Sequence, residues 1–400
     1  MITRRAAGYA TAARDVMLTT ELIDPDSSTD VGRFIEVPYR LYREDPNWVP
    51  PLRRDAALVL NRKRHPFYEH SDASFFVAVR DGRVVGRIGA LELRPYNRAH
   101  GVRQVSFTMF DCEDDVEAAG ALFDCVCGWA LARRLDRAVG PRGLSALDGY
   151  GVLVHGFDRR QLMTMTSYNA PWYPRLLEAY GFRKEVDFVT YQLSSASFVM
   201  PDAVRLAAER AQASLRIVRH GSTRALVRAA RSIGATYNRA FVNNWEFYPI
   251  TSHEVDFLVE QVRPLADHRL MTFIAAGDEP VGFVLAFPDV SEALQRARGR
   301  MTPVALVRLL LARRRARSVA LNGAGILPRY QGRGGNALLY VQLERAIRAG
   351  GFDWAELPQV AETATRMRRD LERLGARPIK THRVYGRDIM PPCAPDLSRR

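Results

Sequence analysis

The chain has few cysteines and no long apolar run. Its four cysteines are Cys112, Cys125, Cys127 and Cys393, and they form no spaced pairs of the kind that bind zinc. No segment reaches the roughly eighteen apolar residues that a membrane span needs, and residues 1–15 lack the apolar core of a signal peptide. These absences predict a cytoplasmic protein with reduced thiols, without a metal site or a membrane span.

Acidic residues are also in deficit. Lysine and arginine number 58 against 44 acids, which gives a formal net charge of +14. The excess indicates an arginine-rich solvated surface, a polyanionic cofactor or RNA, and charge alone does not separate these three. With 400 residues, 47% of them hydrophobic, the composition is that of a globular protein of two domains.

The segment with the most information covers residues 318–351. Aliphatic and β-branched residues over 319–327 predict a strand, and a helix opens near Asn336, with apolar positions at 338, 339, 343 and 347. Between them, Gly332, Gly334 and Gly335 permit positive φ, so several N–H groups can converge at the start of the helix. Such a turn favours binding of a phosphate.

The spacing of this turn excludes two common phosphate loops. No Gly-Lys-Ser/Thr step is present, and RYQGRGG does not match Gly-x-Gly-x-x-Gly. The run from Gln331 through Gly332, Arg333 and Gly334 to Gly335, after Pro328, resembles the pyrophosphate loop of the GNAT acyltransferase superfamily. Asn336 departs from the usual Gly or Ala. Asn is a favoured N-cap, so the helix start is retained, and its side chain either crowds or contacts the cofactor.

The first half of the chain predicts a similar order of elements without that loop. Acids at 111–117, where a helix begins, repel phosphate. Asn169, Trp172, Tyr173 and the Gly181-Phe182 ending resemble the late helix of a GNAT domain. The expected elements are helices within 30–64, a hairpin over 74–93 turning at Asp81-Gly82, a strand 105–110, a helix 117–134, a strand 137–139, a helix 167–182 and a strand 185–193.

The second half repeats this order around the glycine-rich loop. Its expected elements are a strand 215–219, helices 223–240 and 252–264, a hairpin 269–289, an insertion 290–317, a strand 353–360, a helix 362–375 and a strand 382–389. We therefore expect a flexible tail over 1–28, a degenerate GNAT-like domain over 29–200 and a GNAT domain over 201–400. The predicted fold class is mixed α/β, with two tandem domains, each a mostly antiparallel twisted sheet flanked by helices.

The resemblance implies an N-acyltransferase that uses acetyl-CoA or another acyl-CoA and no metal. In that superfamily an amine attacks the thioester directly, without a covalent enzyme intermediate. Carried onto this sequence, the cofactor-binding residues are Gly325, Ile326 and Leu327 beside the pantetheine, and Gln331, Gly332, Arg333, Gly334, Gly335 and Asn336 at the pyrophosphate.

The resemblance does not carry the usual general acid onto this sequence, because Leu371 stands where many members of the superfamily have a tyrosine. Tyr385 on the last strand is the candidate acid in its place, and Tyr340 on the cofactor helix is the second candidate. Glu356 is the candidate base, because burial inside a strand would raise its pKa. For all three, an ordinary structural role is the alternative. Glu362 is expected to cap the following helix.

The loop over 241–251 is a candidate acceptor site. Asn244, Trp245, Phe247 and Tyr248 combine aromatic surface with hydrogen-bonding groups, although core packing explains them equally well. His65 and His70 are expected to be a chance pair rather than metal ligands. The basic segment 302–318 is either a packed helix with solvated arginines or a contact for an acidic partner, a membrane surface or RNA.

Two other functions remain open from the sequence. One is an aminoacyl-tRNA-dependent ligase of tandem GNAT type, which the positive charge favours and the intact loop opposes. The other is a non-catalytic CoA-binding or scaffold protein, suggested by Leu371. The expected acceptor is a small-molecule or peptide amine, and the sequence does not distinguish a monomer from a homodimer.

Overall fold

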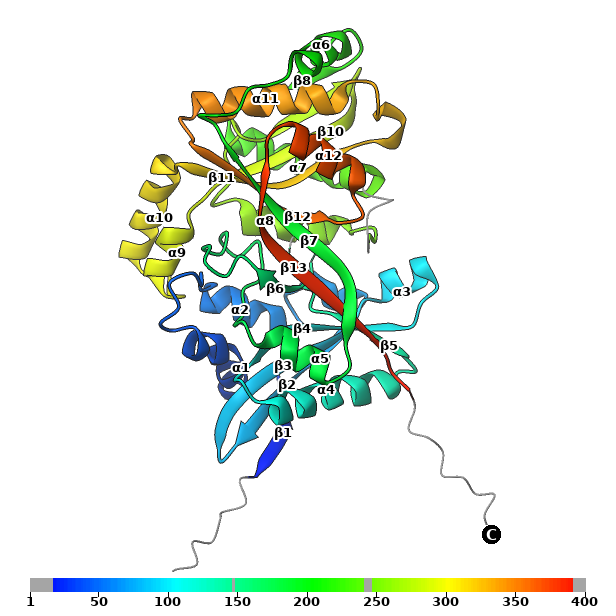
Figure 1. The fold of residues 1–400 in the computed structure, drawn as a ribbon, viewed down its shortest axis with the longest axis vertical. Coiled ribbons are helices and arrows are strands. Elements are labelled where there is room, and N and C mark those ends of the chain that lie inside the picture. Colours follow the sequence, from blue (N-terminus) through cyan, green and yellow to red (C-terminus); the bar gives the residue numbers. More distant parts are fainter. Residues whose placement is uncertain (1–16, 146–147, 241–246, 391–400) are drawn as a thin grey trace, which may run out of the picture.

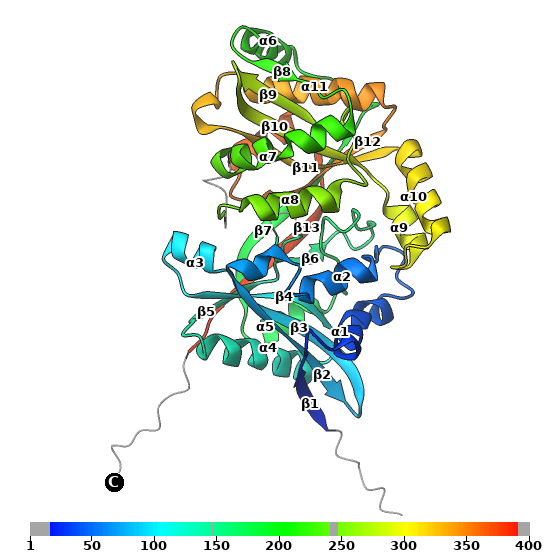
Figure 2. The ribbon, with the colours of Figure 1, turned by 180° about the vertical axis from the view of Figure 1, so that it is seen from behind.

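The structure is a computed structural model that describes residues 17–145, 148–240 and 247–390. In the first half, short helices and strands alternate, as Figures 1 and 2 show from opposite sides. The elements are β1 Leu18–Leu22, α1 Ser28–Leu41, α2 Arg53–Leu60, the 3₁₀ helix η1 Pro66–Glu69, β2 Asp72–Arg80, β3 Arg83–Glu92, α3 Arg94–His100, β4 Gln104–Cys112, α4 Val116–Leu131, β5 Arg137–Gly140, β6 Val152–His155, α5 Tyr173–Ala179 and β7 Arg183–Ser194.

The second half follows the same plan with a two-helix insertion. Its elements are α6 Asp202–Ala211, β8 Arg216–Val218, α7 Thr223–Ala240, α8 Ser252–Val262, β9 Thr272–Ala276, β10 Glu279–Pro288, α9 Ser291–Ala297, α10 Pro303–Arg315, β11 Ser318–Ile326, the 3₁₀ helix η2 Pro328–Tyr330, α11 Gly335–Ala349, β12 Trp354–Ala361, α12 Thr365–Arg373 and β13 Arg377–Asp388.

The strands form one continuous mixed sheet rather than two separate ones. Its order is β1-β2-β3-β4-β5-β13-β7-β12-β11-β10-β9-β8, with β6 beside β13. The last strand of each half therefore lies toward the other half: β13 pairs with β5 of the first half, and β7 pairs with β12 of the second. The two exchanged strands also pair with each other along most of their length, and both run diagonally through the middle of Figure 1. The division at residue 200 remains a prediction.

Local sequence explains most of the elements. The β2–β3 turn holds Asp81 and Gly82 at φ of 51° and 76°, which a primed hairpin turn requires. Helix α8 begins with a capping box, because Thr251 accepts from the Glu254 amide while the Glu254 carboxylate accepts from the Thr251 amide. The insertion 290–317 forms α9 and α10, and Thr302 caps α10.

Several elements differ from the sequence-based expectation. Residues 18–22 lie within the expected flexible tail, yet they pair with β2. The helix expected over 167–182 is confined to Tyr173–Ala179, because Asn169 instead bonds the backbone of Leu153. Helices α3 and α6 were not expected, and β13 begins five residues earlier than predicted.

The apolar cores cross the boundary between the halves. One cluster joins Phe34, Phe67 and Phe75 of the first half to Tyr248 and Val255 of the second. Because burial of these side chains is shared, the two halves stabilise each other. Among the described residues, no helix has the length and apolar character to cross a bilayer.

Candidate active site

A cleft opens in the second half where two parallel strands separate. Strands β11 and β12 pair only from Ser318 to Ala320, opposite Trp354 to Glu356. Beyond Ala320 the strands diverge, and a cavity of about 950 Å³ lies between them, α11 and α12. A volume of this size lies in the upper part of the range of about 300–1,000 Å³ that is typical of ligand sites.

A bulge in β11 exposes backbone to this cleft. Val284 of β10 pairs with Ala324, whereas Ala286 pairs with Leu321, so β11 carries one extra residue between these points. Gly323 in the bulge has φ of 124°, which a residue with a Cβ rarely adopts. Asn322, Gly323 and Ala324 all line the cavity. The bulge therefore places backbone groups that are out of register with β10 beside any ligand.

The glycine-rich loop forms one end of the cleft. Gly332 and Gly334 have φ of 73° and 81°, and Gly334 is the N-cap of α11. Residues 331–334 form a turn, and the amides of Gly335, Asn336 and Ala337 precede the first intrahelical bond of α11, which Leu338 donates to the Gly334 carbonyl. No acidic residue lies in the first turn of α11, so the positive end of the helix dipole is not neutralised from within the chain.

Two of the loop glycines are required by close packing. A Cβ on Gly334 would lie 2.5 Å from the Ala207 carbonyl oxygen, and one on Gly335 would lie 2.1 Å from Ile326 Cδ1. A Cβ on Gly332 would meet nothing within 4 Å. Gly334 and Gly335 thus hold the loop against α6 and β11, while Gly332 faces open space.

The structure brings most of the predicted cofactor residues to the cavity. Gly325, Ile326, Gln331, Gly332 and Asn336 line it. Leu327 is buried in the core instead, and its amide donates to Val281. Arg333 is exposed beside the loop, where Gln331 Nε2 donates to the Ile326 carbonyl at 3.3 Å.

Of the three predicted catalytic residues, Tyr340 alone lines the cavity. Its hydroxyl lies 3.5 Å from Met367 Sδ on α12. Leu371, one turn further along α12, also lines the cavity. Burial and the nearby Asp370 carboxylate raise the pKa of Tyr340 to about 12. At neutral pH this hydroxyl is therefore protonated and can donate.

Glu356 lies on the opposite face of the sheet. Its neighbours Ala355 and Leu357 line the cavity and Glu356 does not, because successive side chains of a strand point to opposite faces. Burial raises the pKa of Glu356, as expected, although Lys380 Nζ, 3.8 Å from its Oε2, acts in the other direction. Gln192 Nε2 donates to its Oε1 at 3.3 Å. The structure gives Glu356 no direct access to the cleft.

Tyr385 also lies outside the lining of the cavity. It is 1% exposed and belongs to the apolar core of the first half. Its hydroxyl donates to Glu178 Oε1 at 3.0 Å. The strand exchange explains this position, because it moves the end of β13 beside β5 and away from the cleft.

Aromatic residues from both halves form the inner end of the cavity. Phe247 and Tyr248 from the predicted acceptor loop line it, together with Tyr150 and Tyr237; the predicted Asn244 and Trp245 lie outside the described residues. Tyr248 is 4% exposed, and its hydroxyl has no hydrogen-bond partner within the described chain. A buried hydroxyl without a partner is costly, so this atom is available to a polar group of a ligand.

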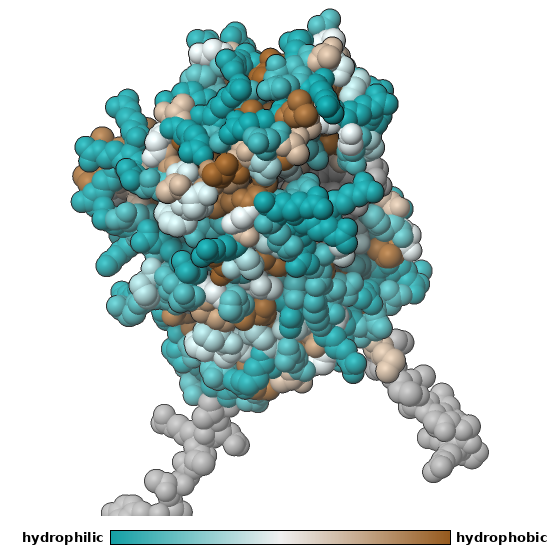
Figure 3. All heavy atoms as spheres, turned by 45° about the horizontal axis from the view of Figure 1, so that its top comes forward, coloured by the Kyte–Doolittle hydropathy of each residue, from teal (hydrophilic) through white to brown (hydrophobic). Residues whose placement is uncertain are grey.

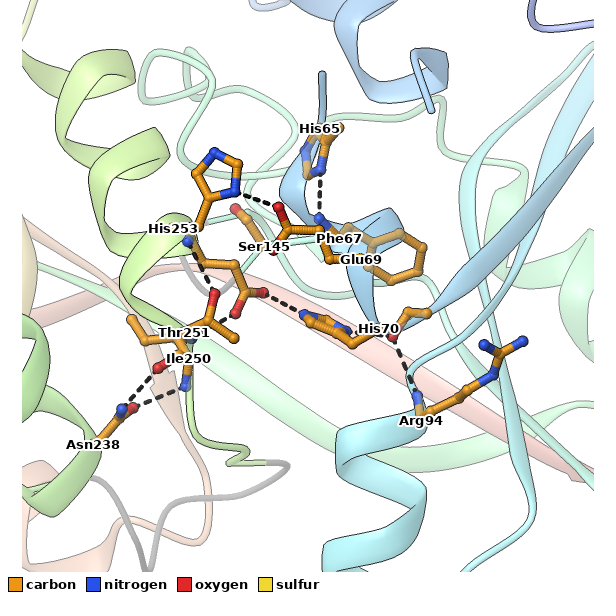
Figure 4. A network of polar contacts seen from close by, with 12 residues as sticks. His65, Phe67, Glu69, His70, Arg94, Ser145, Asn238, Ile250, Thr251 and His253 are labelled. Atoms are coloured by element: carbon orange, nitrogen blue, oxygen red, sulfur yellow. Dashed lines mark hydrogen bonds and ion pairs between the residues drawn. The ribbon is translucent and has the colours of Figure 1, made fainter. Parts of the chain in front are cut away.

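A polar network adjoins this inner end. Figure 4 shows His253 of α8 directed toward Glu69 of η1, and His70, at the end of η1, directed toward α8. His70 Nε2 lies 3.2 Å from Glu254 Oε1, and His65 accepts from the Phe67 amide. His70 therefore joins the two halves, and His65 does so through its ring, whose centroid lies 4.6 Å from that of Phe257 of α8. None of the described His, Cys, Asp and Glu side chains form a group of three suited to a metal ion.

Glu254 connects the network to the cavity electrostatically. Burial raises the pKa of both Tyr237 and Tyr248, and the Glu254 charge raises it further, while Arg142 acts against this. Sequence reasoning missed Tyr150, Tyr237 and Glu254 as part of the site. They come from separate segments, and no local motif joins them.

Sequence comparison finds two long matches. No protein-family model matches the chain. It is 29% identical to the bacterial ceramide synthase of Caulobacter vibrioides over 372 residues, which cover 91% of this chain and 96% of that protein. It is 27% identical to Protein YghO of Escherichia coli over 371 residues, covering 91% and 94% of the two chains.

Structural comparison matches almost the whole chain. A tandem GNAT protein from the clavulanic acid biosynthesis pathway aligns with a TM-score of 0.54 at 13% identity, over 94% of this chain and all of that one. A GCN5-related N-acetyltransferase from Anabaena variabilis aligns with a TM-score of 0.50 at 10% identity, over 94% and 73%. The chain therefore has the tandem GNAT fold that the glycine-rich loop and the order of elements predict.

Proposed function

We propose that the protein is an acyl-CoA-dependent N-acyltransferase whose acceptor is a long-chain amine. The observation that carries this proposal is the separation of β11 from β12 beyond Ala320, with a cavity between them and the glycine-rich loop at one end. Ceramide, in the name of the Caulobacter relative, is the amide of a fatty acid with a long-chain amino alcohol. We extend that class of acceptor to this chain.

The residues around the loop fit the charge and shape of a CoA diphosphate. The first-turn amides of α11, at residues 335–337, can supply donors, and Gly332 leaves open space in the loop before them. Arg366, Arg369 and Arg373 of α12 line the cavity and add positive charge. When bound, acyl-CoA supplies the acyl group as an activated thioester.

The chain can assist the transfer at two points. At the β11 bulge, a backbone N–H of Asn322 or Gly323 can donate to the oxygen on which negative charge develops during attack. At the leaving group, the hydroxyl of Tyr340 can donate its proton to the thiolate, and the proton that the amine nitrogen loses on forming the amide restores the hydroxyl through solvent. The Tyr340 hydroxyl contacts Met367, which lies one turn before Leu371 on α12. In this proposal Tyr340 of α11 therefore supplies the hydroxyl that a tyrosine at the position of Leu371 supplies in many members of the superfamily.

The inner end of the cavity suits a polar head group attached to an apolar chain. Tyr248 offers a buried hydroxyl, Tyr150 and Tyr237 line the same end, and the nearby Glu254 favours binding of the amine as a cation, which must lose a proton to solvent before it attacks. Apolar side chains line the adjoining walls, among them Phe188, Phe198 and Phe283. An apolar cavity of this size accommodates more than an acetyl group, so we propose a longer acyl chain, with acetyl-CoA as the alternative donor.

The proposal is tested by measuring thiol release from acyl-CoA donors of two to eighteen carbons, with sphinganine as acceptor and mass spectrometry of the amide product. We expect turnover that rises with donor length. Turnover with acetyl-CoA alone would exclude the long-chain donor but retain the reaction class. Absence of CoA binding in isothermal titration at millimolar ligand, with the fold verified by circular dichroism, would exclude the whole proposal.

A further inference from the structure

Helix α10 turns its apolar residues outward. Five of the thirteen large hydrophobic residues that are exposed in the described chain lie on it: Val304 (58% exposed), Leu306 (47%), Val307 (56%), Leu310 (49%) and Leu311 (43%). The side that packs on the protein carries Ala305 and Leu309. An ordinary surface helix presents polar residues to solvent. The outward face of α10 is the reverse of this pattern.

Arginines flank the apolar face, and acids are absent from the segment. Residues 297–317 contain seven arginines and no aspartate or glutamate. Arg308, Arg314 and Arg315 are exposed and have no ion pair within the described part of the chain. Arg313 donates to the Pro264 carbonyl at 3.2 Å, and Arg317 pairs with Asp353 at 2.6 Å. At the left margin of Figure 3, where α10 lies in Figure 1, apolar and hydrophilic side chains are exposed side by side.

We propose that α10 binds the surface of an anionic lipid bilayer, with its axis in the plane of the membrane. Long arginine side chains beside an apolar arc can reach phosphate groups while the aliphatic residues enter the acyl boundary. A second copy of the chain is a poorer occupant, because two such faces would bring together six exposed arginines, Arg308, Arg314 and Arg315 of each copy, that have no ion pair within the described part of the chain. The residues of α10 do not line the cavity, so this surface is distinct from the proposed acyltransfer site and does not depend on it.

The test is co-sedimentation of the full chain with vesicles of phosphatidylcholine alone or with about one third phosphatidylglycerol. We expect at least tenfold stronger partition onto the anionic vesicles, weakening as salt is added. A triple variant combines Arg308→Gln, Arg314→Gln and Arg315→Gln. Its partition onto anionic vesicles should fall by about 100-fold, because each arginine near the membrane surface contributes about fivefold.

A second variant tests the apolar face. Substituting Val307→Ser, Leu310→Ser and Leu311→Ser should lower partition at least tenfold without unfolding, because these side chains are exposed. The matched controls change other exposed residues and should bind as the wild type does. The control for the serine variant combines Leu22→Ser, Val102→Ser and Leu206→Ser. The control for the glutamine variant combines Arg43→Gln, Arg64→Gln and Arg98→Gln.

Three results would overturn the proposal. Failure of the wild type to sediment with anionic vesicles at low salt is the first. The second is an equal loss of partition in a control variant and in the matching α10 variant, since it would show that binding does not depend on α10 in particular. The third is a serine variant that converts a dimer to a monomer in light scattering while vesicle binding is unchanged, because self-association would then cover this face.

Discussion

Gly332 and Gly351 provide a matched pair for testing the phosphate loop. Both have positive φ, 73° and 68°, and a Cβ on either would meet no atom within 4 Å. They lie at the two ends of α11, Gly332 before its N-terminus and Gly351 after its C-terminus. An alanine at either position therefore introduces the same backbone strain and no steric clash.

The size of each effect follows from this geometry. Holding an alanine at positive φ costs about 1–2 kcal/mol, so Gly332→Ala and Gly351→Ala should lower the free energy of unfolding by similar amounts. Gly332→Ala should in addition weaken CoA binding by about 10- to 100-fold, because its Cβ would occupy the open space where the diphosphate approaches the loop and would displace it from a charge-assisted hydrogen bond of about 1.5–3 kcal/mol. Gly351 lies at the negative end of the helix dipole and should leave CoA affinity unchanged.

The assay is isothermal titration of CoA into the wild type and both variants, with urea unfolding of each protein. Both variants should lose stability, and only Gly332→Ala should lose affinity for CoA. Equal CoA dissociation constants for all three proteins would refute the assignment of the diphosphate to residues 331–336. An equal loss of affinity in both variants would attribute it to general destabilisation instead.

Three further predictions concern single side chains. Tyr340→Phe should lower kcat by about 10- to 100-fold and leave CoA affinity unchanged, since it removes one proton donor and no binding contact; parallel kinetics and titration measure this. Tyr248→Phe should raise KM for the amine about tenfold without loss of stability, because its hydroxyl has no partner in the described chain, and a stability loss above about 1 kcal/mol would contradict this explanation. Burial lowers the pKa of His382 to about 4, so a contribution of about 3 kcal/mol to the free energy of unfolding should be present above pH 6.5 and lost as the pH falls toward 4. Urea unfolding at a series of pH values should show that the free energy of unfolding falls less steeply for His382→Gln than for the wild type. Equal pH dependence in the two proteins would refute the lowered pKa.

The glycine-rich loop could be located from the sequence because its chemistry is local. Positive φ at Gly332 and Gly334 and a helix start at Gly335 depend on residues within a few positions of each other. The same holds for the Asp81-Gly82 hairpin. In each case the residue types fix the backbone without help from distant segments.

The candidate acid and base show where this reasoning ends. The sequence predicts the strand that contains Glu356. Successive side chains of a strand point to opposite faces of the sheet, so an error of one residue decides whether a side chain faces the cleft. Ala355 and Leu357 face the cleft. Tyr385 was placed on the correct strand as well, but β13 crosses into the first half, and long-range pairing of this kind has no local signal.

The strand exchange gives the first half a part in the site, although its sequence predicts no phosphate loop there. Because β7 pairs with β12, Phe188 of the first half lies opposite Ala361 at the far end of the cleft, where its ring stacks on Tyr150 at 5.1 Å. Both aromatic residues line the cavity, opposite a helix start and loop supplied by the second half. Loss of phosphate binding in the first copy would thus leave its role in shaping the acceptor end intact. On this reasoning the two halves form one site with two unlike ends, which suits the proposed transfer of an acyl group from a charged carrier, released as the free thiol, to an amine bound at the other end.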